Sequence, residues 1–272
     1  MVLEIAGGLM TNSLALMSDA GHMFSDAGAL ALSLLAMRLA AKPSTPRRSY
    51  GYRRFEILAA LLNGIALFAM AGFILREAVE RFRVPAEVSG GLMSVIAVIG
   101  LAANLASAWH LMRKGDVESN LNVRSAWLHI IGDALGSVGA IAAGVVISLT
   151  SWHWADPLIS VFVALLIVRS AWGVTRSAVH ILMEGTPETI DAGKVREELL
   201  AIDGVLDLHD LHIWTITSGM NALSCHLRVR DEQNEQDVLR EAIRRIEEGF
   251  RIRHATIQIE KSGCLHPDLE CN

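Results

Sequence analysis

The stretch His-Met-Phe-Ser-Asp at residues 22–26 lies inside a long apolar run, and the stretch His-Ile-Ile-Gly-Asp at residues 129–133 repeats its pattern in a second run. On a helix, residues four apart lie on one face, so each stretch presents an imidazole beside a carboxylate. An ionisable group at bilayer depth costs at least ~2.5 kcal/mol, so such groups rarely persist there without a partner or a task. The two matched pairs therefore indicate a functional site within a membrane.

The chemistry of the four side chains favours a metal ion. If the two helices pack together, His22, Asp26, His129 and Asp133 converge, and two nitrogens with two carboxylate oxygens suit a tetrahedral divalent metal, zinc first. A lone intramembrane histidine is more often a packing or hydrogen-bonding residue, but the duplication favours ligation. We interpret Asp19, one turn before His22, as a helix N-terminal residue or a charge on the access path rather than as a fifth ligand.

The composition separates a membrane part from a soluble part. Hydrophobic residues make up 52% of the 272 residues and the mean hydropathy is +0.38, which is too apolar for an ordinary soluble domain. Residues 1–185 carry 14 Lys and Arg against 12 Asp and Glu, whereas residues 186–272 carry 10 against 17. An apolar part is thus followed by an acidic one, and no region is basic enough to indicate nucleic-acid binding.

We place the domain boundary at the Glu-Gly-Thr-Pro sequence of residues 184–187. This predicts a transmembrane domain over residues 1–184, a cytoplasmic domain over 185–262 and a C-terminal tail over 263–272. All three cysteines lie after the boundary, and their spacing argues against a disulfide framework and for a reducing, cytosolic setting.

Five apolar runs are long enough, at about 20 residues, to cross a bilayer as helices. They are Leu14–Met37, Ile57–Leu75, Leu92–Met112, Ala126–Leu149 and Leu158–Met183. The residues before them have no basic region and no cleavage site, so we interpret them as the end of a sixth helix rather than as a signal peptide. The basic segment 38–54 holds no acidic residue, so the positive-inside rule places it, and with it the soluble part, in the cytoplasm.

The soluble part has the pattern of a small α+β domain. It predicts a helix over 188–201, strands over 205–216 and 222–229, a helix over 235–250 and a strand over 255–260. Apolar and polar residues alternate through Leu208–Ile213, as in a half-buried strand. This order packs helices on one face of a small sheet, which is a ferredoxin-like or metallochaperone-like layout.

Histidines on the predicted strands raise the question of a second metal site. His209, His226 and Glu260 fall on three strands and meet if these strands are neighbours. Surface histidines are also common in acidic domains, and the spacing alone does not decide between the two interpretations. His209 and His212 lie three apart on an alternating strand, so we expect them on opposite faces and not in one site.

Several motifs lie in order along nearly the whole chain. They are Ser18–His22 with Asp26, Tyr50–Glu56, His129 with Asp133–Ser137, Asp156-Pro157, and His209–Trp214. Together they resemble the cation diffusion facilitator family, in its zinc-transporting branch.

The resemblance implies an α-helical multi-pass membrane domain of the six-helix type, with the first helix truncated in this sequence, and a cytoplasmic ferredoxin-like domain. It implies a homodimer in the lipid bilayer. It also implies a secondary active transporter that exports zinc, with cobalt and cadmium as further cargo, from the cytosol in exchange for protons by alternating access. We expect the plasma (inner) membrane as its location.

The resemblance also implies roles for individual residues. The transport site comprises His22, Asp26, His129 and Asp133. The ligands of a regulatory zinc ion in the cytoplasmic domain comprise His209, His226 and Glu260, with Cys264 and Cys271 matching a C-terminal thiol pair. The charge pair that joins the two domains comprises Arg54 and Glu184.

Two other functions compete with transport. An intramembrane metalloenzyme, such as a protease, needs an open zinc position and a general base, typically the glutamate of a His-Glu-x-x-His helix. Neither that spacing nor that base is present, and four protein ligands leave no open position. A non-transporting regulatory paralogue is favoured only by the shortened first helix.

Overall fold

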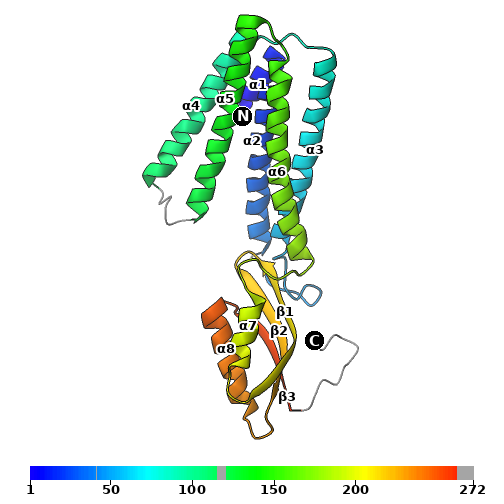
Figure 1. The fold of residues 1–272 in the computed structure, drawn as a ribbon, viewed down its shortest axis with the longest axis vertical. Coiled ribbons are helices and arrows are strands. Elements are labelled where there is room, and N and C mark those ends of the chain that lie inside the picture. Colours follow the sequence, from blue (N-terminus) through cyan, green and yellow to red (C-terminus); the bar gives the residue numbers. More distant parts are fainter. Residues whose placement is uncertain (41, 115–120, 262–272) are drawn as a thin grey trace. The chain divides into compact units, whose positions relative to one another are not determined.

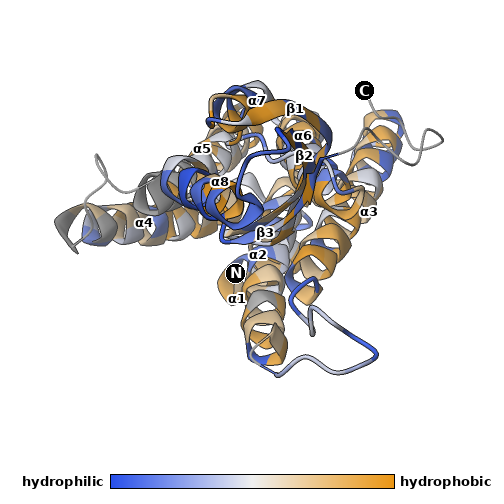
Figure 2. Cartoon of the chain, turned by 90° about the horizontal axis from the view of Figure 1, so that it is seen from below, coloured by the Kyte–Doolittle hydropathy of each residue, from blue (hydrophilic) through white to orange (hydrophobic). Residues whose placement is uncertain are grey.

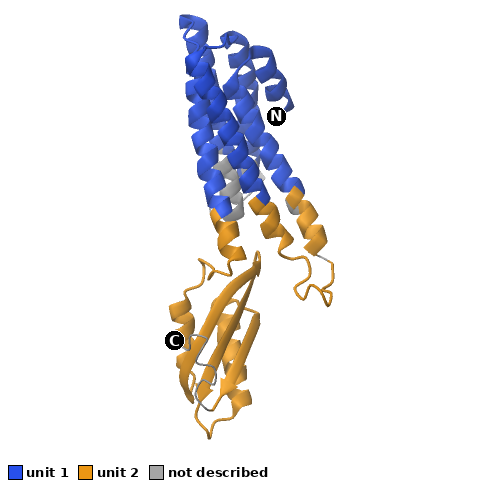
Figure 3. Ribbon diagram, turned by 90° about the vertical axis from the view of Figure 1, so that its right-hand side faces the viewer, with its two compact units in different colours: residues 1–31, 62–175 blue, residues 32–61, 176–272 orange. Residues whose placement is uncertain are grey.

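The computed structural model describes residues 1–40, 42–114 and 121–261, with the side chains of 33, 111, 113, 114, 121–129 and 131 outside the description. The chain separates into two compact units. One comprises residues 1–31 and 62–175, and the other comprises residues 32–61 and 176–272 (Figure 3).

In the described part of the chain, six helices precede the small α/β domain (Figure 1). A short apolar helix, α1 (Val2–Thr11), is followed by α2 (Leu14–Ala40), α3 (Phe55–Arg83), α4 (Gly90–Lys114), α5 (Leu121–Thr150) and α6 (Ala155–Leu182). Among the described residues, five of these helices are long and apolar enough to cross a membrane. The five predicted spans are therefore confirmed as helices.

The long helices expose apolar side chains. Figure 2 shows mostly hydrophobic residues along α3. Phe73 is 59% exposed and Trp172 is 63% exposed, and many other large apolar side chains of the long helices are exposed too. Apolar surface on this scale is typical of helices that face lipid, because there is no water to exclude from it.

The helix of the second predicted span is longer than predicted. The sequence predicts that this span ends at Leu75, but α3 continues to Arg83. The reason is local, because Arg76 pairs with Glu80 at 3.1 Å and Arg81 pairs with Glu77 at 3.1 Å. Pairs four residues apart stabilise an extra turn of helix beyond the apolar run.

The start of α2 is capped from a distant helix. Asp156, in the first turn of α6, is fully buried and accepts hydrogen bonds from the hydroxyl of Ser13 at 2.5 Å and from the backbone N–H groups of Leu14 at 2.8 Å and Ala15 at 3.1 Å. Arg81 of α3 lies 3.5 Å from the same carboxylate. Because a helix N-terminus has unpaired N–H groups and partial positive charge, a buried carboxylate there fixes α2 against α6 and α3.

The remaining elements form a small α/β domain in the predicted order. They are α7 (Ala192–Leu200), β1 (Val205–Thr217), β2 (Met220–Val229), α8 (Glu235–Phe250) and β3 (His254–Glu260). β2 lies between its neighbours, antiparallel to β1 and parallel to β3. The first helix starts later than the predicted residue 188 because Asp191 is its N-cap, accepting from the N–H groups of Gly193 and Lys194.

This domain has its own hydrophobic core. The fully buried side chains come from both helices and from β1 and β2, among them Val195, Leu223 and Ile246, and all members of the cluster lie between residues 190 and 252. A self-contained core of this kind is the mark of a unit that folds independently. On β2 the core residues Leu223, Cys225 and Leu227 occupy odd positions, so the even positions face away from the helices.

Strand β1 contains a bulge at Asp210. His209 pairs with His226, but the next paired residue, His212, is opposite Ser224, so three steps on β1 match two steps on β2. Asp210 has a φ of 54°, in the left-handed region that aspartate tolerates better than most residues. The extra residue changes which positions of β1 face the core.

Candidate functional site

The first candidate site lies between α2 and α5. The Nε2 atom of His22 is 3.6 Å from Oδ2 of Asp26 and 3.7 Å from Oδ1 of Asp133. His22 and Asp26 are one turn apart on α2, whereas Asp133 comes from α5. The structure therefore brings together three of the four predicted side chains, with the imidazole between two carboxylates.

The fourth predicted ligand and the predicted thiol pair are not among the described side chains. His129 lies one helical turn before Asp133 on α5, but its side chain is outside the described residues. Cys264 and Cys271 also lie outside them.

A second contact between α2 and α5 involves Asp19. Its side chain is buried, and the hydroxyl of Ser137 donates to its Oδ2 atom over a long 3.5 Å. A Cβ at Gly136 would lie 3.4 Å from the other carboxylate oxygen, so the glycine leaves room for this carboxylate between the helices. Asp19 thus lies inside the helix packing rather than at an exposed helix start.

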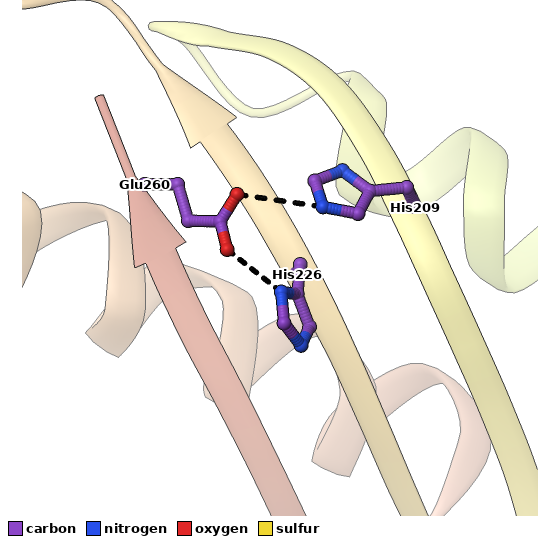
Figure 4. A group of neighbouring side chains, drawn as sticks. All are labelled: His209, His226 and Glu260. Atoms are coloured by element: carbon purple, nitrogen blue, oxygen red, sulfur yellow. Dashed lines mark hydrogen bonds and ion pairs between the residues drawn. The ribbon is translucent and has the colours of Figure 1, made fainter. Parts of the chain in front are cut away.

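The second candidate site lies on the sheet (Figure 4). The Nδ1 atom of His226 is 2.7 Å from Oε1 of Glu260, and the Nε2 atom of His209 is 3.4 Å from Oε2 of the same carboxylate. One ligand atom from each residue can be chosen so that all three lie within 4.8 Å of one another. The three strands β1, β2 and β3 each contribute one of these side chains.

The sheet register explains why these residues meet. His209 and His226 are directly paired, and Glu260 is the register partner of Arg228 on the adjacent strand, two positions from His226. All three lie on the face of the sheet away from the helices. Yet His209 is only 6% exposed, so its imidazole is desolvated.

The donor set fits a zinc ion. Among the described side chains, His209 Nε2 and Glu260 Oε2 are buried atoms with no hydrogen-bond partner, and they face each other across 3.4 Å. Two ligands of a tetrahedral zinc ion, each about 2.0 Å from the metal, are roughly 3.3 Å apart. Buried polar atoms without partners are costly, and a shared cation removes that cost.

The prediction that His209 and His212 face opposite sides of the sheet is wrong. Their partners on β2, His226 and Ser224, are two residues apart and so lie on one face, which places His209 and His212 on that same face. The bulge at Asp210 is the cause. Its signal in the sequence is the pair of adjacent polar residues, His209 and Asp210, inside an otherwise alternating strand.

The buried cysteine near this site is not a ligand candidate. Cys225 lies on the core side of β2 and is 1% exposed. Burial, assisted by the nearby carboxylate of Asp210, raises the pKa of its thiol to about 12. Since the thiolate is the metal-binding form, Cys225 is a core residue at neutral pH.

The predicted charge pair is in contact. The Nη2 atom of Arg54 donates to Oε1 of Glu184 at 2.9 Å. Sequence reasoning missed the neighbouring Glu56, whose carboxylate accepts from the hydroxyls of Thr217 at 2.6 Å and Ser218 at 2.7 Å. No spacing rule relates Glu56 to a hairpin more than 160 residues later, so only the tertiary structure identifies this contact.

This chain is similar to known proteins along nearly its whole length. Residues 1–183 match a family model for the cation efflux transmembrane domain, and residues 187–262 match one for the cation efflux protein, cytoplasmic domain. The cadmium, cobalt and zinc/H(+)-K(+) antiporter of Bacillus subtilis (strain 168) is 48% identical over 269 residues, which cover 98% of this chain and 86% of that protein.

Two further relatives are similar over comparable lengths. The zinc transporter ZitB of Escherichia coli (strain K12) is 41% identical, with 100% of this chain and 87% of that protein covered. The metal cation efflux system protein CzcD of Cupriavidus metallidurans is also 41% identical, with 98% of this chain and 84% of that protein covered.

Proposed function

The chain belongs to the cation efflux, or cation diffusion facilitator, family, and from this premise we propose that it exports zinc from the cytosol in exchange for protons. Family membership makes it a metal transporter rather than an enzyme, and a multi-pass membrane protein with a cytoplasmic C-terminal domain. The proposal names zinc as the preferred cargo and cobalt and cadmium as further cargo. It also includes the exchange for protons and the plasma (inner) membrane as location.

The observation that carries the proposal is the meeting of His22 with Asp133, 3.7 Å apart and from two different helices. With Asp26 and His129 these residues form our proposed transport site. The carboxylates carry up to two negative charges in a low-dielectric setting, and one divalent cation neutralises both.

Protons compete with the metal for the same atoms. Imidazole binds a metal only in its neutral form and, when unperturbed, titrates near pH 6.5, close to the pH of the cell. A proton-loaded site and a metal-loaded site are thus alternatives, which is the requirement for exchange. Tilting of one helix group against another around the site would then expose it to each side in turn.

The test is zinc flux in proteoliposomes that contain the purified protein. With a pH gradient across the membrane, zinc should move against its own concentration gradient into the acidic compartment. Protons should leave that compartment at the same time. Fluorescent zinc and pH indicators follow both ions at once. Zinc movement that is unaffected by collapsing the pH gradient would rule out proton exchange.

We expect His22→Asp to broaden the choice of metal. Replacing an imidazole by a carboxylate makes the site harder, which relaxes the preference for zinc toward cadmium and manganese. Competition of these ions with zinc transport in the same liposomes measures the effect. An unchanged order of preference would argue against a ligand role for His22.

We further propose that zinc regulates the transporter through the site on the sheet. Zinc held by His209, His226 and Glu260 would fix three strands together and favour the homodimer of the cytoplasmic domain, and with it one state of the transporter. We propose accordingly that the transmembrane, transporting domain ends at residue 184. The cytoplasmic, regulatory domain then comprises residues 185–262, and the C-terminal tail follows it.

For the isolated domain, residues 187–262, we expect zinc to tighten dimer association at least tenfold, or ~1.4 kcal/mol. Glu260→Gln should abolish this response because a neutral amide is a poor zinc ligand. Sedimentation equilibrium with and without zinc measures it. Glu247→Gln is the matched control, since Glu247 is an exposed residue of α8 paired with Arg253 at 3.5 Å. Equal dimer affinity with and without zinc would refute the regulatory role.

A further inference from the structure

We propose that Asp210 is a positioning residue for zinc on the sheet, because it holds His226 through the ring nitrogen that the metal does not use. The inference rests on the proposed function of His209, His226 and Glu260 as zinc ligands. It gives a role to a residue that lies inside the His209–Trp214 motif but that the sequence analysis did not assign to the site.

The contacts of His226 distinguish its two ring nitrogens. Its Nδ1 atom faces Glu260 at 2.7 Å, inside the ligand cluster, whereas its Nε2 atom lies 3.6 Å from Oδ2 of Asp210. The geometry therefore assigns Nδ1 to the metal and Nε2 to Asp210. A ring whose Nδ1 binds a metal carries its proton on Nε2, and that N–H needs an acceptor.

A carboxylate behind a metal-binding histidine has a known physical effect. It accepts the second ring N–H, selects the tautomer, fixes the ring plane and makes the ligating nitrogen more basic. The 3.6 Å separation is longer than a hydrogen bond. At this distance the negative charge of Asp210 still favours a proton on the Nε2 atom that faces it.

The bulge is what makes this arrangement possible. In a regular strand Asp210 would point to the opposite face from His209, toward the core. With a φ of 54° at Asp210 and one extra residue in the register, its carboxylate instead reaches the face that carries His209 and His226. A strained backbone conformation held at one residue is often found beside a functional site.

The carboxylate of Asp210 is itself held in place. Its other oxygen, Oδ1, lies 2.8 Å from Nε2 of His212, which the same bulge brings to this face. His212 is largely exposed, at 64%. A chain of contacts thus runs from the solvent-exposed His212 through Asp210 and His226 to Glu260.

The experiment uses the full chain in detergent, with Asp26→Ala and Asp133→Ala to remove the transport site, and measures zinc affinity by competition with a chromophoric chelator. Asp210→Gly removes the carboxylate and still allows the left-handed backbone. It should weaken zinc binding 10–100-fold, as is typical for such partners. Asp210→Asn retains an acceptor oxygen and tolerates the same backbone, so it should recover most of the affinity.

Cobalt(II) absorption reports the ligand set directly. Because Asp210 acts through His226, the visible spectrum of the cobalt-loaded Asp210→Gly chain should keep the shape and intensity of the parent. Asp203→Gly is the control for loss of one carboxylate, since Asp203 is 92% exposed and is 4.0 Å from Arg230. It should leave zinc affinity unchanged.

Three results would overturn the inference. They are unchanged zinc affinity in Asp210→Gly, an equal loss in Asp203→Gly, and a cobalt spectrum of Asp210→Gly that shows a lost ligand. A parent chain that binds no zinc at all would instead refute the proposed site itself, and the inference with it.

Discussion

Asp133→Ala is expected to abolish zinc uptake into inverted membrane vesicles. The change removes from the proposed transport site the carboxylate that α5 contributes, 3.7 Å from His22. Loss of an outer partner of a metal ligand already lowers affinity by about 10–100-fold, so loss of a ligand should lower transport by at least ~100-fold. Initial rates of zinc uptake at matched protein levels give the measurement.

The matched control is Glu80→Ala. Glu80 is also a helix carboxylate, but it is exposed and pairs with Arg76 at 3.1 Å near the end of α3. Its removal should leave the uptake rate close to that of the parent. If the Asp133→Ala protein still transported zinc in a pH-dependent way, Asp133 would have to be excluded from the site.

Asp156→Ala is expected to lower the free energy of unfolding by roughly 3–5 kcal/mol, the range measured when one partner is removed from a buried charged pair. The change leaves the Ser13 hydroxyl and the N–H groups of Leu14 and Ala15 without their buried acceptor. It also removes a carboxylate partner of Arg81, which keeps its pair with Glu77 at 3.1 Å. Such a loss is a large part of the stability of an ordinary domain.

The thermal midpoint in detergent, followed by intrinsic fluorescence, measures this effect. Ser160→Ala is the control one turn along α6, because Ser160 is buried too but donates only to a backbone carbonyl, that of Asp156 at 2.8 Å. That bond competes with the helix ladder, so its loss should change little. Equal midpoints for the two variants would refute the capping role of Asp156.

The type and order of the elements were accessible from the sequence because they depend on local patterns. Apolar runs of membrane length predicted the long helices, and the alternation of apolar and polar residues predicted β1. The boundaries were less accurate where local charges or caps decide them. Pairs such as Arg76 with Glu80 lengthened α3, and the N-cap Asp191 delayed the start of α7.

The candidate sites were predictable to different degrees. His22 and Asp26 share a helix face, so their spacing alone predicted a joint role, and the repeat pointed to Asp133. The meeting of His209, His226 and Glu260 was left open by the sequence, since it depends on which strands are neighbours and in what register. Asp210 and Asp156 were not predicted as site or capping residues.

The sequence by itself determined which side chains are candidates for the chemistry, namely the two His-x-x-x-Asp steps in apolar helices and the histidines of the soluble domain. It did so because helical periodicity and hydropathy act over a few residues. Only the tertiary structure decided that α2 meets α5, that a bulge turns Asp210 and His212 toward His226, and that Asp156 caps α2 from more than 140 residues away. These contacts depend on packing and register between distant segments, which no local pattern encodes.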